Sequence, residues 1–330
     1  MRFDFIKCHG SGNDFPLIDA RGVVLDDAVW AGVARALADR RGPVGGDGLL
    51  LLTDGDRTQA FGMRMFNSDG SEAETCLNGL RCVARAGFEA LGLERAEVHL
   101  KTSVAHAELD RALAAGVYTV RETAGPADLD VTHWPLTGLE PHEIVEQVIP
   151  MLPTTRRFTA VAMPNPHLVS FGDDNGGAID ESELVAVGSV CESAPDWLPN
   201  RANVSFVGMR DDGIFVRTFE RGVGLTDSCG SAMAASVFAA CLTGRRAFGA
   251  EMRVFNRGGL VLGQAESDGM VRLSGNATWE WAGSAEVDAA RGSAGDLIVT
   301  RHYNDEIAAW AAVVEAAARG PAASGAEPSG

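Results

Sequence analysis

The chain has 330 residues, of which 46% are hydrophobic and 22% are charged, and its formal net charge is −17 at pH 7. This length suggests about two domains of roughly 150 residues, each large enough to bury its own core. The acidic composition without a Lys/Arg cluster excludes nucleic-acid binding, and no apolar run of about 18 residues predicts a membrane span, so we expect a cytoplasmic protein.

Two segments of the chain, Arg64–Cys76 and Arg217–Cys229, are related by a gapless offset of 153 residues. Both read Arg-x-Phe, a polar loop with glycine, an acidic residue, a hydroxyl residue and cysteine. Strand-like residues precede each segment, and an Ala-rich apolar run follows each cysteine and closes at Gly92 or Gly244, as is typical of a helix. The repeat therefore predicts a cysteine at the N-terminal end of a helix in each of two halves.

A second, weaker similarity between the halves relates two polar turns, His9–Phe15 and Pro164–His167. Each turn lies beside an apolar run. The chain between 124 and 155 is rich in Pro, Gly and Asp and is predicted to cross between the halves. We therefore expect an α+β fold of two similar domains that face each other across a cleft. Near the C-terminus, Asp305–Arg319 is predicted to form an amphipathic helix, and the low-complexity tail from Pro321 onward is predicted to be disordered.

The two repeated cysteines could form a pair of acid/base groups. A helix N-terminus carries partial positive charge and unpaired N–H groups, so it favours a thiolate near neutral pH and can also bind a carboxylate. If both helices point at one cleft, one thiolate can take a proton from the carbon beside a carboxylate while the opposite thiol returns one to the other face. This arrangement predicts stereochemical inversion without a cofactor.

Other metal and cofactor chemistry is not expected. The six cysteines (Cys8, Cys76, Cys82, Cys191, Cys229 and Cys241) form no CxxC pair and no close Cys/His spacing, so no metal site is predicted. The four cysteines outside the repeat are interpreted as buried structural thiols. The loop Gly45–Gly48 resembles a phosphate loop only superficially, because no Lys-Ser/Thr follows it.

The motifs resemble those of the diaminopimelate epimerase family. They are His9–Phe15, Phe66–Glu74, Cys76–Cys82, Asn165–His167, Asn203–Val204, Glu220–Gly224 and Cys229–Ser231, in the family's order over residues 1–286. The resemblance implies two structurally similar domains, each a mixed or antiparallel sheet wrapped around a central helix, with the active site in the cleft between them. It further implies a cofactor-independent isomerase that interconverts LL- and meso-diaminopimelate for lysine and peptidoglycan biosynthesis.

The resemblance also assigns residues. Cys76 and Cys229 are the two catalytic acid/base thiols. The expected substrate-binding residues are Asn13, Asn67, Leu77, Asn78, Gly79, Asn165, Asn203, Glu220, Arg221, Gly230 and Ser231. Among them, Arg221 suits a distal carboxylate, Glu220 suits a distal ammonium, and the N–H groups at the two helix starts suit the carboxylate at the reacting carbon. His167 and Glu72 are expected to assist the thiols.

By the same resemblance, the first half covers residues 1–122 and is completed by a returning strand near 273–286. The second half covers 123–272, and 287–330 is a C-terminal extension with one helix and the disordered tail. The expected partner is the small-molecule substrate, diaminopimelate. A homodimer is one possible assembly, which the sequence does not decide.

Five positions depart from the family pattern. Leu77 stands where the family usually has Gly, Leu225 where it usually has Glu, Asp227-Ser228 replaces a small apolar pair, and Met233 replaces a smaller residue. These changes bear on the substrate more than on the reaction type. Two alternatives therefore remain open: a related racemase of another amino acid, such as histidine or a proline derivative, and a non-catalytic relative that binds an amino acid.

Overall fold

The computed structural model describes residues 1–139, 142–172 and 179–319, and it contains one element order twice. The first copy comprises β1 (Arg2–Gly10), β2 (Asn13–Asp19), α1 (Asp27–Ala38), β3 (Gly48–Asp54), β4 (Phe61–Asn67), β5 (Glu72–Ala73), α2 (Leu77–Leu91), β6 (Arg95–His99), β7 (Val104–Leu109) and β8 (Thr119–Ala124). The second comprises β10 (Arg157–Ala162), β11 (Pro166–Phe171), α3 (Glu181–Glu192), β12 (Asn203–Arg210), β13 (Gly213–Glu220), β14 (Gly224–Thr226), α4 (Gly230–Leu242), β15 (Met252–Asn256), β16 (Gly259–Ala265) and β17 (Val271–Asn276). A 3₁₀ turn, η1 (Val131–His133), and β9 (Gln147–Val148) lie between the copies, and β18 (Thr278–Asp288), β19 (Ser293–His302) and α5 (Asn304–Arg319) follow them.

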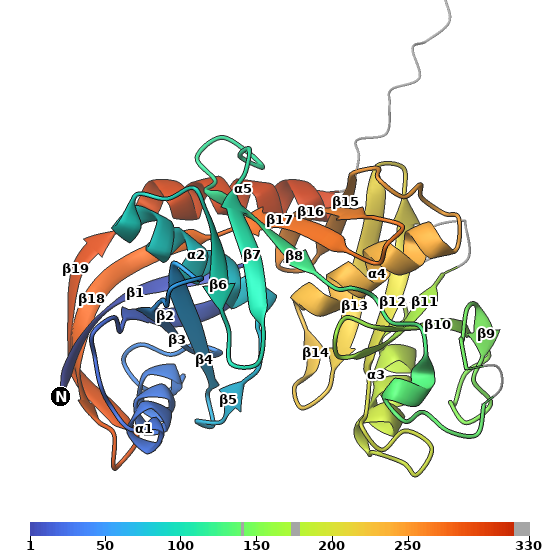
Figure 1. Cartoon of the computed structure of the whole chain (residues 1–330), viewed down its shortest axis with the longest axis horizontal. Helices are drawn as coiled ribbons and strands as arrows, with labels where there is room; N and C mark the ends of the chain where they lie inside the picture. The colour runs from blue at the N-terminus through green and yellow to red at the C-terminus, as the bar shows by residue number, and fades with distance from the viewer. Residues whose placement is uncertain (140–141, 173–178, 320–330) are drawn as a thin grey trace, which may run out of the picture.

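Strand pairing is equivalent in the two copies. The first two strands of each copy form an antiparallel hairpin, and the second and third strands pair parallel. In the same way, β4 pairs parallel with β6, and β13 with β15. Antiparallel pairing of β8 with β17 joins the two sheets, and β18 returns to pair with β1. The predicted α+β architecture of two similar domains is thereby confirmed (Figure 1).

The helices that follow the repeated cysteines occupy the centres of the two halves. Helix α2 ends at Gly92, which adopts φ 67° and donates its N–H to the Phe88 carbonyl, as a left-handed C-terminal residue does. Helix α4 is buried around almost its whole circumference, which an Ala-rich apolar helix requires. Both helices contribute to the same hydrophobic core, so the core is continuous across the two halves. The helices predicted from the repeat are confirmed.

Several elements escaped the sequence analysis, among them two helices and the last strand. Helices α1 and α3 pack against one sheet face in each half, where they form two further hydrophobic clusters. Strand β19 lies in the segment for which only a helix was expected, and it pairs with β18. Its side chains are mostly exposed, so it lacks the alternation of buried and exposed residues that marks a half-buried strand. The predicted disordered tail lies outside the described residues.

Helix α5 packs on both halves, on the side where the two sheets are joined (Figure 1). Near its start, the Glu306 carboxylate accepts two hydrogen bonds from the Arg85 guanidinium of α2, at 2.5 and 2.8 Å. In its middle, the buried Trp310 ring packs so closely on the β16 turn that a Cβ atom at Gly259 would lie 2.4 Å from it. Near its end, the Ala317 carbonyl accepts a bond from Arg210 of β12. The helix therefore ties the halves together. No helix in the described ranges is long and apolar enough to cross a membrane.

Trp310→Ala should lower the free energy of unfolding by about 3–5 kcal/mol, because it removes a buried aromatic ring and leaves a cavity between α5 and the β16 turn. Ile307→Ala is the matched control on the same helix, since its side chain is 39% exposed, and should change stability by less than about 1 kcal/mol. Urea unfolding of both variants measures the difference. Equal losses would mean that Trp310 does not anchor the helix.

Candidate active site

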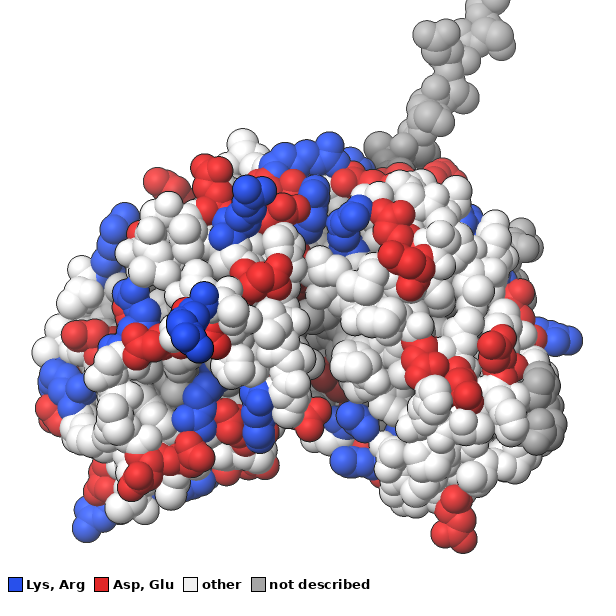
Figure 2. Space-filling view, viewed as in Figure 1, with Lys and Arg blue, Asp and Glu red and all other residues white. Residues whose placement is uncertain are grey.

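The two repeated cysteines begin the two central helices. Cys76 is the N-terminal capping residue of α2 and Cys229 that of α4, and both have extended backbone conformations. The helix starts are in contact, since a Cβ atom built on Gly230 would lie only 2.6 Å from the Leu77 Cβ. The strands before them, β5 and β14, flank the notch between the halves (Figures 1 and 2). The structure thus places both helix N-termini at the junction of the halves.

Each thiol has polar neighbours from its own helix and one from elsewhere. The Gly79 N–H points to the Cys76 sulfur at 3.4 Å, and the Cys76 thiol lies 3.7 Å from the Asn13 side-chain oxygen. The Cys229 sulfur lies 3.5 Å from the Ser231 hydroxyl, and the Glu220 carboxylate is close enough to act on the pKa of its thiol. Four of the expected substrate-binding residues, Asn13, Gly79, Glu220 and Ser231, therefore lie beside the thiols, and their role toward substrate remains a prediction.

The expectation that helix N-termini make these thiols ionise near neutral pH is wrong for the ligand-free molecule. Burial raises the pKa of Cys76 to about 12, although the Gly79 N–H opposes the shift. Burial also raises the pKa of Cys229 well above its usual range, and the neighbouring Glu220 adds to the effect. Desolvation of the sulfur outweighs the helix N–H groups, since Cys229 is buried and Cys76 is partly buried. Both cysteines are therefore protonated at rest.

Glu220 supplies a group that can accept a thiol proton. Burial raises its pKa to about 7, and the charge of Asp47 adds to the shift, whereas the Cys229 thiol and Arg221 oppose it. A carboxylate that titrates near neutral pH beside a thiol is suited to take up or release the thiol proton. Glu220 is therefore the candidate proton acceptor for Cys229.

Buried polar atoms without partners lie near Arg221. Asn203 is fully buried; its side-chain oxygen accepts the Arg221 N–H at 2.9 Å, while its side-chain nitrogen has no partner among the described residues. His167 lies opposite Asn203 in register, and its Nε2 is 3.1 Å from the Asn165 side-chain oxygen. Its Nδ1 also lacks a partner in the described chain, and burial, then Arg221, lowers its pKa to about 3. The Asn203 nitrogen is an orphaned donor that suits a ligand's oxygen atom, whereas the neutral His167 ring donates through Nε2 and so presents Nδ1 as an acceptor.

The Asn78 side chain connects the two halves and is only 2% exposed. Its nitrogen lies 3.4 Å from both the carbonyl and the hydroxyl of Ser228, the residue before Cys229, and its oxygen accepts a bond from Arg81 at 2.7 Å. With its side chain engaged in this way, Asn78 has only backbone groups left for a ligand.

Two expected site residues are engaged elsewhere. The Asn67 side chain donates to the Ser71 hydroxyl at 2.9 Å. Glu72 forms ion pairs with Arg64 at 2.7 Å and with Lys101 at 3.6 Å. These contacts stabilise the loop before Cys76, and the predicted roles of Asn67 and Glu72 toward substrate and thiols remain predictions.

The sequence analysis missed Asp47. Its carboxylate accepts a hydrogen bond from the Asn13 side chain at 2.5 Å and lies close enough to Glu220 to raise the pKa of that residue. The available signal was an acidic residue within the Gly45–Gly48 loop, a loop that was considered only as a phosphate site.

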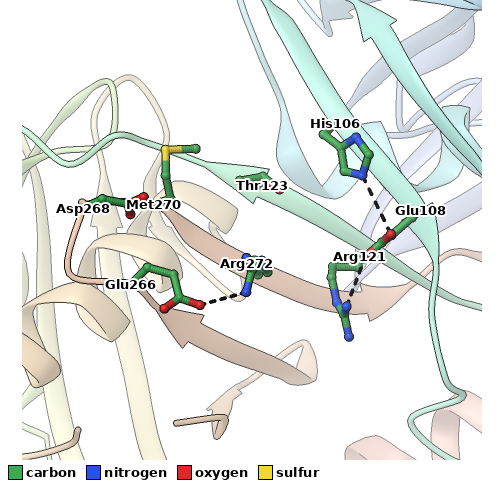
Figure 3. A pocket seen from close by; sticks show the side chains of 8 residues that line it. All are labelled: His106, Glu108, Arg121, Thr123, Glu266, Asp268, Met270 and Arg272. Carbon is green, nitrogen blue, oxygen red and sulfur yellow. Dashed lines mark hydrogen bonds and ion pairs between the residues drawn. The ribbon is translucent and has the colours of Figure 1, made fainter. Parts of the chain in front are cut away.

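A separate surface pocket of about 490 Å³ lies at the junction of β7, β8, β16 and β17 (Figure 3). Its charged side chains are already paired, Arg121 with Glu108 at 3.0 Å and Arg272 with Glu266 at 2.8 Å. It contains none of the predicted site residues. Within residues 1–139, 142–172 and 179–319, no group of three or more His, Cys, Asp or Glu side chains is arranged to hold a metal ion.

The chain is similar to known proteins in sequence and in fold. The family model described as diaminopimelate epimerase matches residues 5–123 and 159–280. The chain is 39% identical over 295 residues to a diaminopimelate epimerase of Clostridium acetobutylicum, covering 87% of each, and 37% identical over 295 residues to one of Listeria monocytogenes, covering 86% of this chain and 88% of the relative. A solved hydroxyproline epimerase from Agrobacterium vitis has the same fold, with a TM-score of 0.60 at 16% identity over 88% of this chain and 95% of that one. The chain therefore belongs to the diaminopimelate epimerase family.

Proposed function

We propose that this protein is a diaminopimelate epimerase, which interconverts LL- and meso-2,6-diaminopimelate without a cofactor. The observation that carries the proposal is the pair of capping cysteines on two contacting helix starts, one from each half. Family membership supports the substrate, and the Glu220–Arg221 pair beside Cys229 is suited to the second zwitterionic end of diaminopimelate.

The reaction moves one proton off the α carbon and another onto its opposite face. In one direction, Glu220 takes the Cys229 thiol proton, and the resulting thiolate removes the proton from the α carbon. The electron pair left on that carbon spreads onto the adjacent carboxylate, which the N–H groups of the two helix starts stabilise. The Cys76 thiol then donates its proton to the opposite face. After this step Cys76 is a thiolate and Cys229 is a thiol, which is the state from which the reverse reaction starts.

Binding of the rest of the substrate is assigned to the groups around Arg221. The Arg221 guanidinium is half-buried, and one of its nitrogens donates to the Asn200 carbonyl at 2.9 Å, which leaves the fork free to bind a distal carboxylate. The orphaned Asn203 side-chain nitrogen is suited to a further oxygen atom of the same group, and the unprotonated His167 Nδ1 is suited to a donor such as an ammonium hydrogen. Asn165 holds the His167 ring in place. The acidic groups Asp47 and Glu74 favour the substrate ammonium groups.

The direct test is incubation of the purified protein with LL-diaminopimelate, followed by chromatographic resolution of the stereoisomers. The proposal requires meso product, formed until the two isomers reach equilibrium. Inversion of histidine or a proline derivative in place of diaminopimelate would favour the related racemase. Binding of diaminopimelate without product would favour a non-catalytic relative.

Arg221→Lys should raise KM for diaminopimelate about 10- to 100-fold, because lysine keeps the charge but loses the planar fork that binds a carboxylate with two hydrogen bonds. Arg253→Lys is the control, since Arg253 is an exposed residue of β15 that pairs with Asp212 at 2.7 Å. The KM for diaminopimelate, and the inhibition constant of a simple amino acid without a distal carboxylate, are measured for the wild type and for each variant. Equal losses for both ligands would mean that Arg221 does not bind the distal carboxylate.

The cellular setting stays a prediction. We propose that the enzyme acts in the cytoplasm in lysine and peptidoglycan biosynthesis, with diaminopimelate as its partner and with a homodimer as the assembly to test.

A further inference from the structure

Asp47 lies between the two halves of the site, in the loop that leads from α1 into β3. Its side chain is 41% exposed, and each carboxylate oxygen has a defined donor. Oδ2 accepts the Asn13 side-chain N–H at 2.5 Å and the Asp14 backbone N–H at 3.1 Å, while Oδ1 accepts the Arg40 guanidinium at 2.7 Å. The Asp47 backbone N–H in turn donates to the Asp14 carbonyl at 2.8 Å. The carboxylate is therefore held in one orientation.

The consequence for Asn13 follows from its chemistry. A side-chain amide has a donating end and an accepting end, whereas a carboxylate only accepts. Because Asp47 accepts from the Asn13 nitrogen, the Asn13 oxygen must point the other way, and it lies 3.7 Å from the Cys76 sulfur. An acceptor in that place favours the protonated thiol over the thiolate.

We infer that Asp47 is a positioning residue: it fixes the Asn13 amide so that its oxygen, and not its nitrogen, faces the Cys76 thiol. Cys76 is thereby held as the proton donor at rest, while Glu220 draws the proton from Cys229 on the other side. Asp47 thus biases the two thiols toward opposite roles. The catalytic meaning of this bias rests on the proposed function, whereas the orientation of the amide does not.

Asp47→Asn tests the inference with little change in shape. The Arg40 cation draws the new amide oxygen to its side, at the cost of the bond from the Asp14 N–H, and the new amide nitrogen then faces Asn13. Two nitrogens cannot bond each other, so the Asn13 amide turns and presents its nitrogen to Cys76. A donor at that sulfur stabilises the thiolate. Asp47→Ala removes the acceptor altogether and should act in the same direction, more weakly.

The readout is alkylation of Cys76 and Cys229 by iodoacetamide from pH 6 to 10, resolved by peptide mass. The groups that face Cys76 are the Gly79 N–H, Asn13, Glu220, Glu122 and Arg81, and of these only Asn13 contacts Asp47. In Asp47→Asn, Cys76 should react at least about 10-fold faster near neutral pH, as a shift of one pKa unit implies. Cys229 should change less. Asp56→Asn is the charge-matched control, because its carboxylate bonds only Thr58 and Gln59 of its own turn, and it should leave both profiles unchanged.

Turnover provides a second readout. In the Asp47 variants we expect kcat/KM for diaminopimelate to fall about 10- to 100-fold, because the Asn13 amide no longer holds Cys76 as the proton donor. The fall must be the same in both directions, because the variants leave the equilibrium between the two isomers unchanged. Unchanged Cys76 alkylation in both Asp47 variants would overturn the inference, and so would an equal acceleration of Cys76 and Cys229, which indicates general loosening. Because alkylation needs no substrate, absence of diaminopimelate turnover in the wild-type protein would contradict the proposed function and leave this test intact.

Discussion

Cys76→Ala and Cys229→Ala are each expected to lose inversion of diaminopimelate by about 10³- to 10⁴-fold or more, because each removes the only acid/base group on one face of the α carbon. The two losses should be similar even though the thiols have different neighbours. The remaining thiol can still exchange a proton on its own face with retention of configuration. Chiral separation of the products measures inversion, and proton NMR in deuterated water measures exchange.

Cys191→Ala is the matched control for both variants. Cys191 is a fully buried thiol on α3, with no contact to the site described above, and its loss makes the same chemical change in the interior. It should retain activity within a few-fold. Full inversion by either Cys76→Ala or Cys229→Ala would mean that the paired thiols are not the acid/base groups.

Arg81→Met should lower the free energy of unfolding by about 3–5 kcal/mol at pH 8, because it leaves the Glu122 carboxylate buried without its cation. Arg81 and Glu122 are both fully buried and joined at 2.6 Å. The guanidinium also donates to the Ser11 hydroxyl and the Asn276 carbonyl, both at 3.1 Å. The variant therefore loosens the contacts of α2 with three other segments, those of Ser11, Glu122 and Asn276.

The loss should depend on pH. Burial raises the pKa of Glu122 to about 7 even though Arg81 opposes the shift. Since the folded state binds this proton more tightly than the unfolded state, the stabilisation is complete below the usual pKa of Glu and is lost as pH rises through the folded value. Without Arg81 the folded pKa rises further, so Arg81→Met should be less destabilised at pH 6 than at pH 8. Urea unfolding at both values tests this, and Arg81→Met combined with Glu122→Gln should recover most of the loss. An equal loss at both pH values would contradict the account.

The parts of the site that local signals encode could be predicted from sequence. A cysteine at each helix start and a glycine after each helix end are features of neighbouring residues, so the positions of Cys76 and Cys229 followed from the repeat. The contact between Leu77 and Gly230 did not follow, because it depends on how two segments 153 positions apart pack together.

Electrostatics at the site could not be predicted in the same way. The helix N-terminus is a local property, and it suggested ionised thiols. Burial is a property of the whole fold, and it raises the pKa of Cys76 to about 12. The Asp47–Asn13 contact likewise joins segments 34 residues apart through a loop with no periodic pattern.

The central claim, that two different thiols act on opposite faces of one carbon, is tested most directly by deuterium incorporation. The protein is incubated with protonated LL-diaminopimelate in deuterated water, and the isomers are separated during the first turnovers and analysed by mass. A thiol carries one exchangeable proton, so the donating thiol delivers deuterium while the proton removed stays on the other sulfur. We predict product with deuterium at the inverted carbon from the first turnover, beside unreacted substrate that remains mostly protonated. Product that retains the substrate's own hydrogen would indicate a single shuttling base and would contradict the account.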